Sequence, residues 1–315
     1  MDYPKSLPNA GLVGGKFVDE DTGAGTPGSL IPAVWGNGIT DEVLNVIKAA
    51  GDVPDETKFD QLLQAIQKLG GSAVGSMRNV RMNVAAASET ANLTADEVVV
   101  ATGLGGRSYR LASINKTINL AAVGAGGMDT GSAPANSFVS IYAIYNPSTQ
   151  ESALLACNQS VSSGSIYTGG NMPSGYTASA LVSAWRTSST GLLVAGSQTD
   201  RAIDVALATI INTTSVLTNS TVSMNSILPI AAVSFSGVLQ CGAASANSSV
   251  TVGLASTPSG LGIKSCGATI TVASAVTQCT FSDMALPTSR TTYVSSTVDI
   301  GSISQAAAFL TSYKI

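Results

Sequence analysis

The sequence predicts a mainly β protein in which an extended segment and a short helix pair precede β-sandwich or jelly-roll-like modules. Three observations support this class. From residue 79 onward, segments rich in Val, Ile and Thr alternate with clusters of Gly, Ser, Pro and Asn. Two short amphipathic segments lie before residue 70. Charge is also uneven, since ten of the 19 acidic residues stand in the first 70 positions. A border is therefore expected near residues 70 and 71.

Residues 1–39 are expected to form an extended segment, because Pro and Gly punctuate a stretch with only isolated apolar residues. Single apolar anchors such as Tyr3, Leu12, Phe17 and Trp35 stand out in it. Aromatic residues buried at an interface often dominate its binding energy, so these four are candidates for attachment to a partner surface. The alternative is that Trp35 only packs on the neighbouring helices.

Residues 40–70 predict two short helices. The first is expected over residues 40–51, with Thr40 as its N-cap and an apolar face of Val43, Leu44 and Ile47. Gly51 would end it.

The second helix is expected to end at Gly70 and to start at a cap formed by Thr57 or Asp55. Its apolar residues follow the i, i+3, i+4, i+7 spacing of a single stripe. They are Phe59, Leu62, Leu63, Ile66 and Leu69. Because a helix of about a dozen residues is marginal alone in water, this stripe needs a partner. The partner could be other copies of the chain or the first helix.

A middle β domain is expected over residues 71–210 and a C-terminal β domain over residues 211–315. Strands are expected at 79–84, 97–102, 116–123, 138–146, 153–158, 177–185, 201–211, 231–239, 248–256, 268–276, 291–300 and 307–315. Many of them show small, uncharged outer faces, which protect strand edges poorly. A closed homo-oligomer would cover such edges.

Several function classes are disfavoured. The chain contains no histidine, which removes the commonest general base and metal ligand. The glycine turns at 103–107 and 124–127 do not match a phosphate-binding spacing. We therefore expect no enzyme activity, cofactor or metal. The net charge of −4, without a basic stripe, also argues against nucleic-acid binding.

No window is long and apolar enough to predict a membrane-spanning helix, and the N-terminus lacks the apolar core of a secretory signal. Synthesis in the cytoplasm is therefore expected. Reduced thiols are then expected at Cys157, Cys241, Cys266 and Cys279, with a disulfide among the last three as the alternative.

The N-terminal run MDYPKSLPNAGLVGGKFVDEDTGAGTPGSLIPAVWGNGITDEVLNVIKAAG, followed by LLQAI, resembles a family of bacteriophage tail-fibre proteins. Further segments resemble it too: RNVRMNV, ADEVVV, NKTINLAAVGAGGMDTG, YAIYNPST, NMPSGYTASALVSAW and DRAI. The resemblance covers about residues 1–210. It implies a homotrimeric virion protein, joined to the phage tail or baseplate by its N-terminus and binding a bacterial receptor near its C-terminus.

On this resemblance, the trimer interface is expected to contain Val43, Leu44, Ile47, Phe59, Leu62, Ile66 and Leu69. One alternative is a tail or baseplate adaptor that never touches the host. Another is a fibre with polysaccharide-degrading activity. The receptor could be a polysaccharide, an outer-membrane protein or a pilus.

Receptor contact is expected on the loops 243–248, 256–262 and 281–290, with Asn247, Asp283 and Arg290 as candidate residues. Three such sites on one trimer would add avidity. The alternative places receptor contact on tyrosines of the middle domain, namely Tyr142, Tyr145, Tyr167 and Tyr176.

Overall fold

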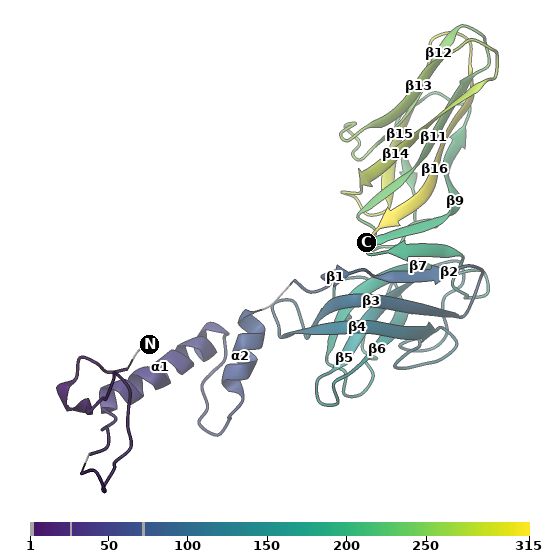
Figure 1. Ribbon diagram of the computed structural model, residues 1–315. Coiled ribbons are helices and arrows are strands. Elements are labelled where there is room, and N and C mark those ends of the chain that lie inside the picture. Colours follow the sequence, from purple (N-terminus) through teal and green to yellow (C-terminus); the bar gives the residue numbers. More distant parts are fainter. Residues whose placement is uncertain (1–2, 26, 71–72) are drawn as a thin grey trace. The chain divides into compact units, whose positions relative to one another are not determined.

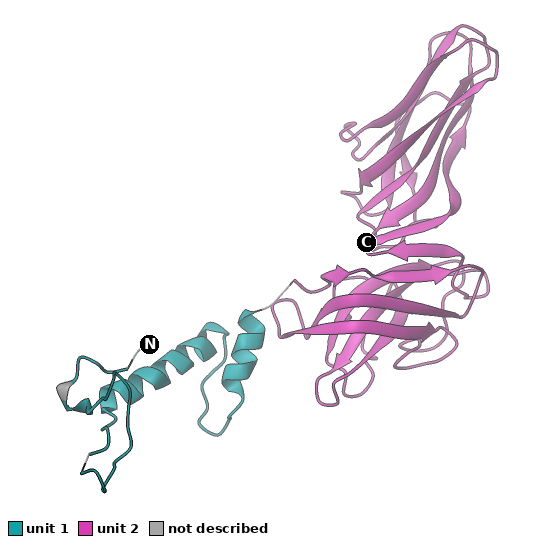
Figure 2. Ribbon diagram, in the orientation of Figure 1, with its two compact units in different colours: residues 1–71 teal, residues 72–315 magenta. Residues whose placement is uncertain are grey.

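A computed structural model describes residues 3–25, 27–70 and 73–315. The chain forms two compact units, residues 1–71 and 72–315, which are described separately here (Figure 2). The border expected between residues 70 and 71, where the middle domain was expected to start, lies at the edge of the described residues.

The N-terminal unit contains a short 3-10 helix η1 (Pro8–Ala10) and two α-helices, α1 (Ala33–Ala49) and α2 (Gln61–Leu69), as Figure 1 shows. The extended chain before α1 folds back on itself. The amide of Ser29 donates to the carbonyl of Val18 at 2.9 Å, and the amide of Leu30 donates to that of Ala10 at 3.1 Å. The extended segment is thus tied together by its own backbone.

The expected helix starts were both wrong. Helix α1 begins at Ala33 after Pro32, and the Thr40 hydroxyl donates to the carbonyl of Gly36 inside the helix instead of capping it. This start was not predicted, because Gly36 and Gly38 lie in the first turns and glycine disfavours helices. Asp55 instead accepts bonds from the amide and hydroxyl of Thr57 in the turn before α2.

The described part of the second unit, residues 73–315, contains sixteen strands. They are β1 (Met77–Arg78), β2 (Arg81–Val84), β3 (Thr90–Ala101), β4 (Ser108–Asn119), β5 (Phe138–Asn146), β6 (Glu151–Asn158), β7 (Ala178–Arg186), β8 (Gly196–Thr199), β9 (Ala202–Thr213), β10 (Leu217–Ser223), β11 (Ser234–Ala243), β12 (Ser248–Ala255), β13 (Lys264–Ile270), β14 (Val276–Ala285), β15 (Thr291–Val298) and β16 (Ile303–Lys314). The mainly β class is confirmed.

The strands form two antiparallel sheets. The 12-stranded sheet has the order β14–β11–β16–β9–β8–β2–β3–β7–β5–β6, with β1 and β4 also paired to β3. The 4-stranded sheet has the order β10–β15–β12–β13. In the C-terminal half, β12 and β13 contact β11 and β14 of the large sheet, so the two sheets face each other as in a β-sandwich (Figure 1).

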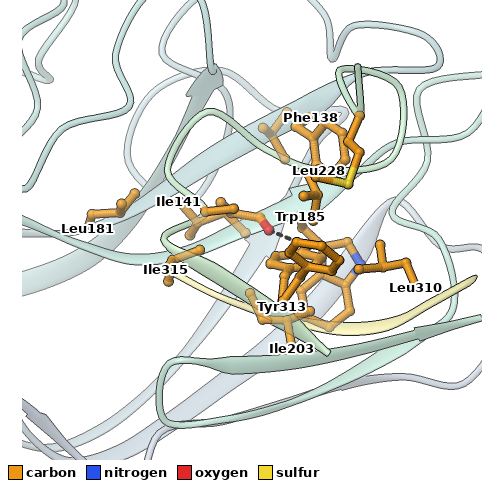
Figure 3. Packing of buried hydrophobic residues seen from close by; sticks show 14 of the residues in the cluster. Phe138, Ile141, Leu181, Trp185, Ile203, Leu228, Leu310, Tyr313 and Ile315 are labelled. Atoms are coloured by element: carbon orange, nitrogen blue, oxygen red, sulfur yellow. Dashed lines mark hydrogen bonds between the residues drawn. The ribbon is translucent and has the colours of Figure 1, made fainter. Parts of the chain in front are cut away.

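The two halves of this unit share a strand and side-chain contacts. Strand β9 runs through the border expected at residues 210 and 211, pairing with β8 on one side and β16 on the other. The hydroxyl of Tyr313 on β16 donates to the carbonyl of Ala184 on β7 at 2.7 Å. Tyr313 and Trp185 are both buried, and Figure 3 shows them grouped with Ile203 and Leu310. One sheet and one core therefore join both halves.

A disulfide links Cys266 on β13 to Cys279 on β14 and so connects the facing sheets. The expectation of four reduced thiols is wrong for this pair, while Cys157 and Cys241 are free and buried. The Cα atoms of Cys266 and Cys279 lie 5.5 Å apart, a normal distance for a disulfide. Which strands face each other depends on tertiary topology, so sequence spacing alone could not identify the pair.

We expect the Cys266→Ala/Cys279→Ala variant to be destabilised by about 3 kcal/mol relative to the oxidised protein, because the bridge closes a short loop in the unfolded chain. Urea denaturation measures this difference. Reductant should lower the stability of the wild type to that of the variant and leave the variant unchanged. Equal stability of the wild type with and without reductant would contradict the expectation.

Candidate functional site

The apolar stripe of α2 faces outward in the single chain. Phe59, which was expected within the helix, lies just before α2 and is 97% exposed, and Leu62, Leu63, Ile66 and Leu69 on α2 are also exposed. Ala65 is buried instead, where α2 contacts α1. The face of α2 that carries Ala65 thus contacts α1, and the face that carries the large apolar side chains stays exposed in the single chain.

On α1, Ile47 is buried, whereas Val43 and Leu44 are half-buried. The intrachain hairpin therefore forms, but it fully buries just one of the seven residues expected at a trimer interface, Ile47. Leu30, Ile31 and Val34 are exposed near the start of α1, and the sequence analysis did not single them out. Exposed apolar surface of this extent marks an interaction site.

Three of the four expected attachment residues meet within the N-terminal unit. The ring of Phe17 lies 5.5 Å from that of Tyr3 and 4.8 Å from that of Trp35, both edge to face. Leu12 is half-buried outside this stack. The stack joins the extended segment to the first turn of α1, so these aromatics have a role in the fold of the unit. Their role in tail attachment stays a prediction.

The three expected receptor residues are not brought together. Asn247 is exposed in the turn between β11 and β12, next to Ser248. Arg290 precedes β15, near the opposite end of β12, because Ala255 pairs with Tyr293. One small ligand cannot contact both residues.

Asp283 lies on β14 and not in the expected loop. It has a positive φ of 49° beside a register shift opposite Phe235 and Gly237, and its carboxylate pairs with Lys314 at 2.6 Å. A polar residue at an irregular strand position resembles a turn residue in sequence, which explains the error.

Four loops gather at the end of the facing sheets that holds Asn247. They are residues 214–216, 244–247, 271–275 and 299–302, which we call the tip loops. Hydrogen bonds tie neighbouring loops together: the amide of Ala244 donates to the carbonyl of Ser302, and the amide of Ser274 donates to that of Ala243, both at 2.8 Å.

The tip loops carry exposed aliphatic side chains on Val216, Val272 and Ile300. Their one charged side chain, Asp299, accepts bonds from the Ser248 hydroxyl and the Ser249 amide. The Ser248 hydroxyl, with backbone amides, holds the pKa of Asp299 below its usual range. The tip is thus an apolar surface on a scaffold tied by hydrogen bonds. Three of these loops were not expected from the sequence: the expected strands 268–276 and 291–300 run into two of them, and nothing singled out residues 214–216.

Two of the four alternative receptor tyrosines are structural. Tyr142 is buried and hydrogen-bonded to the Ser162 hydroxyl at 2.8 Å, and Tyr167 is buried and donates to the Asp129 carboxylate at 2.7 Å. Burial raises the pKa of both.

Tyr145 and Tyr176 are half-buried. Tyr145 packs on Tyr109 at 5.0 Å, and Tyr176 lines a 340 Å³ groove with Lys116 and Glu151. Only this pair remains available to a ligand.

Comparison of the sequence with protein-family models and with curated proteins yields no match. Within the described ranges, no group of three His, Cys, Asp or Glu side chains is placed to hold a metal ion. No helix in the same ranges has the length and apolar character needed to cross a membrane.

Proposed function

We propose that the chain is a trimeric receptor-binding fibre of a bacteriophage virion. On this proposal the N-terminal unit joins the tail or baseplate, and the tip loops bind a bacterial surface receptor. The exposed apolar stripe of α2 carries the proposal. A nine-residue helix with its large side chains in solvent is not stable by itself, and copies of the same helix can bury those side chains.

The resemblance of residues 1–210 to tail fibres supports this role. Asn247, Val216, Val272 and Ile300 then form the proposed receptor surface, with Asp283 and Arg290 at the opposite end of the facing sheets. Loops on a rigid β scaffold commonly carry binding residues, because the scaffold holds them while their sequence varies. An adaptor would use the same trimer without binding cells.

Replacing Val272 and Ile300 by glutamate tests the receptor site. We expect binding of fluorescent protein to bacterial strains that bind the wild type to fall by about tenfold or more. Burying a carboxylate against an apolar surface costs well over the roughly 1.4 kcal/mol of a tenfold change.

Leu261→Glu is the matched control, because Leu261 is equally exposed but lies in the loop between β12 and β13, away from the tip. Loss of binding in Leu261→Glu alone would move the site to the opposite end. Wild-type protein that binds no strain would favour the adaptor. Degradation of surface polysaccharide by purified protein would favour the enzyme.

A further inference from the structure

A second cavity, of about 130 Å³, opens on the larger unit, with Ala195 and Ala206 exposed in its lining and Phe138 and Tyr313 buried. It is formed where the end of β7, the residues before β8, strand β9 and the loop after β10 meet. Its walls are almost entirely apolar and include Phe138, Val205, Ile227 and the ring of Tyr313. The one charged residue in its lining is Arg186, the last residue of β7.

The Arg186 guanidinium has no counter-charge among the described residues. Its Nε atom is buried and has no hydrogen-bond partner there, and no ion pair joins the side chain to a described acid. Asp204 neighbours Val205 on β9, but its side chain is exposed and points to the other face of the strand.

The Nε–H of Arg186 is costly to the fold, because a buried donor without a hydrogen-bond partner loses its hydration without replacement. The side chain as a whole is half-buried, and its guanidinium stays charged at any physiological pH. Arg186 lies close to Tyr313, since burial raises the pKa of Tyr313 while the Arg186 charge opposes that rise. The Tyr313 hydroxyl is already committed to Ala184. The cavity therefore combines apolar walls with a cation that lacks an anion.

We infer that this cavity binds a small monocarboxylate whose remaining atoms are mostly apolar, such as pyruvate or propionate. The planar guanidinium fork matches a carboxylate in a bidentate pair, and the apolar walls suit a methyl or ethyl group. A cavity of about 150 Å³ holds a benzene-sized molecule, so the space fits an acid of this size.

The carboxylate has two possible sources. It can be a free organic acid, or it can be a pyruvyl or lactyl substituent on a surface polysaccharide. The second source rests on the proposed receptor-binding function, and the first does not.

Calorimetric titration of the full chain with pyruvate and with propionate tests the site. We expect binding to the wild type, and binding to Arg186→Met weakened by about tenfold or more, because a charge-assisted hydrogen bond accounts for a factor of that order. Arg81→Met is the matched control, since Arg81 is an exposed arginine that donates to the Thr199 hydroxyl.

Thermal unfolding gives a second measurement, for which an arginine with a purely structural role would give a different result. Without ligand, Arg186→Met should unfold at or above the midpoint of the wild type, because it removes a buried donor that has no hydrogen-bond partner. With pyruvate, only the wild type and Arg81→Met should shift upward. Failure of both acids to bind the wild type, or equal binding by Arg186→Met, would overturn the inference.

The source is resolved with a pyruvylated polysaccharide before and after mild acid removes its ketal groups. If the intact polymer competes with free pyruvate for the cavity and the acid-treated polymer does not, the ligand is a polysaccharide substituent. Binding of the free acids without competition by either polymer assigns it to a small metabolite. Cell binding of wild-type protein is measured separately, so failure of the cavity and failure of the receptor-binding function remain distinguishable.

Discussion

Replacement of Trp185 by alanine is expected to lower the free energy of unfolding by about 3–5 kcal/mol, the usual cost of removing a large buried aromatic. Trp185 is 1% exposed, and its indole N–H donates to the Val194 carbonyl at 2.8 Å. Trp185 packs with Tyr313 from β16 (Figure 3). The alanine substitution therefore leaves an empty space between elements from both halves of the unit. We therefore expect both halves to lose stability together.

Hydrogen exchange of amides in β5 and β12 measures this coupling, because each strand reports on one half. Protection should fall by a similar free energy in both strands. Tyr313→Phe is the control, since it keeps the ring and removes only the hydroxyl bond to Ala184, at a cost of about 1 kcal/mol. Protection lost in β5 but retained in β12 would show that the halves unfold independently.

The mainly β class was predictable because period-two patterns survive in strands with one buried face. Strand β2, with Met82 and Val84 buried and Arg81 and Asn83 exposed, is an example. The pattern failed where alternation continued through a turn. Residues 271–275 contain no Gly, Pro or Asn, so one strand was expected where the chain leaves β13 and enters β14.

The stripe on α2 was also predictable, since it depends only on local spacing. What it contacts was not, because the sequence does not say that Ala65 would face α1. The candidate site required topology as well. Asn247 and Ile300 lie at one end of the facing sheets only because successive strands cross between the sheets. Likewise, Tyr142 and Tyr145 are near neighbours on β5, yet only Tyr142 is fully buried.

The protein is expected to be a trimer, and replacing both Leu62 and Ile66 by aspartate is expected to dissociate it into monomers. Burying one such side chain contributes about 1.5–3 kcal/mol, so the pair contributes about 3–6 kcal/mol per chain before the cost of burying two carboxylates. Both side chains are more than one-third exposed in the single chain, so the substitution removes little from the fold of the monomer.

Sedimentation at micromolar concentration measures the change in mass, and circular dichroism checks that the β unit stays folded. Gln67→Asp is the control, because it places a carboxylate on α2 outside the apolar stripe and should leave the trimer intact. In the proposed trimer, three copies of α2 would give the stripe the partner that Ala65 and Ile47 do not supply within one chain. A wild type that sediments as a monomer would contradict the trimer itself. A variant that stays trimeric would place the interface elsewhere, with the Ser/Thr-rich edges of the β unit as the next region to test.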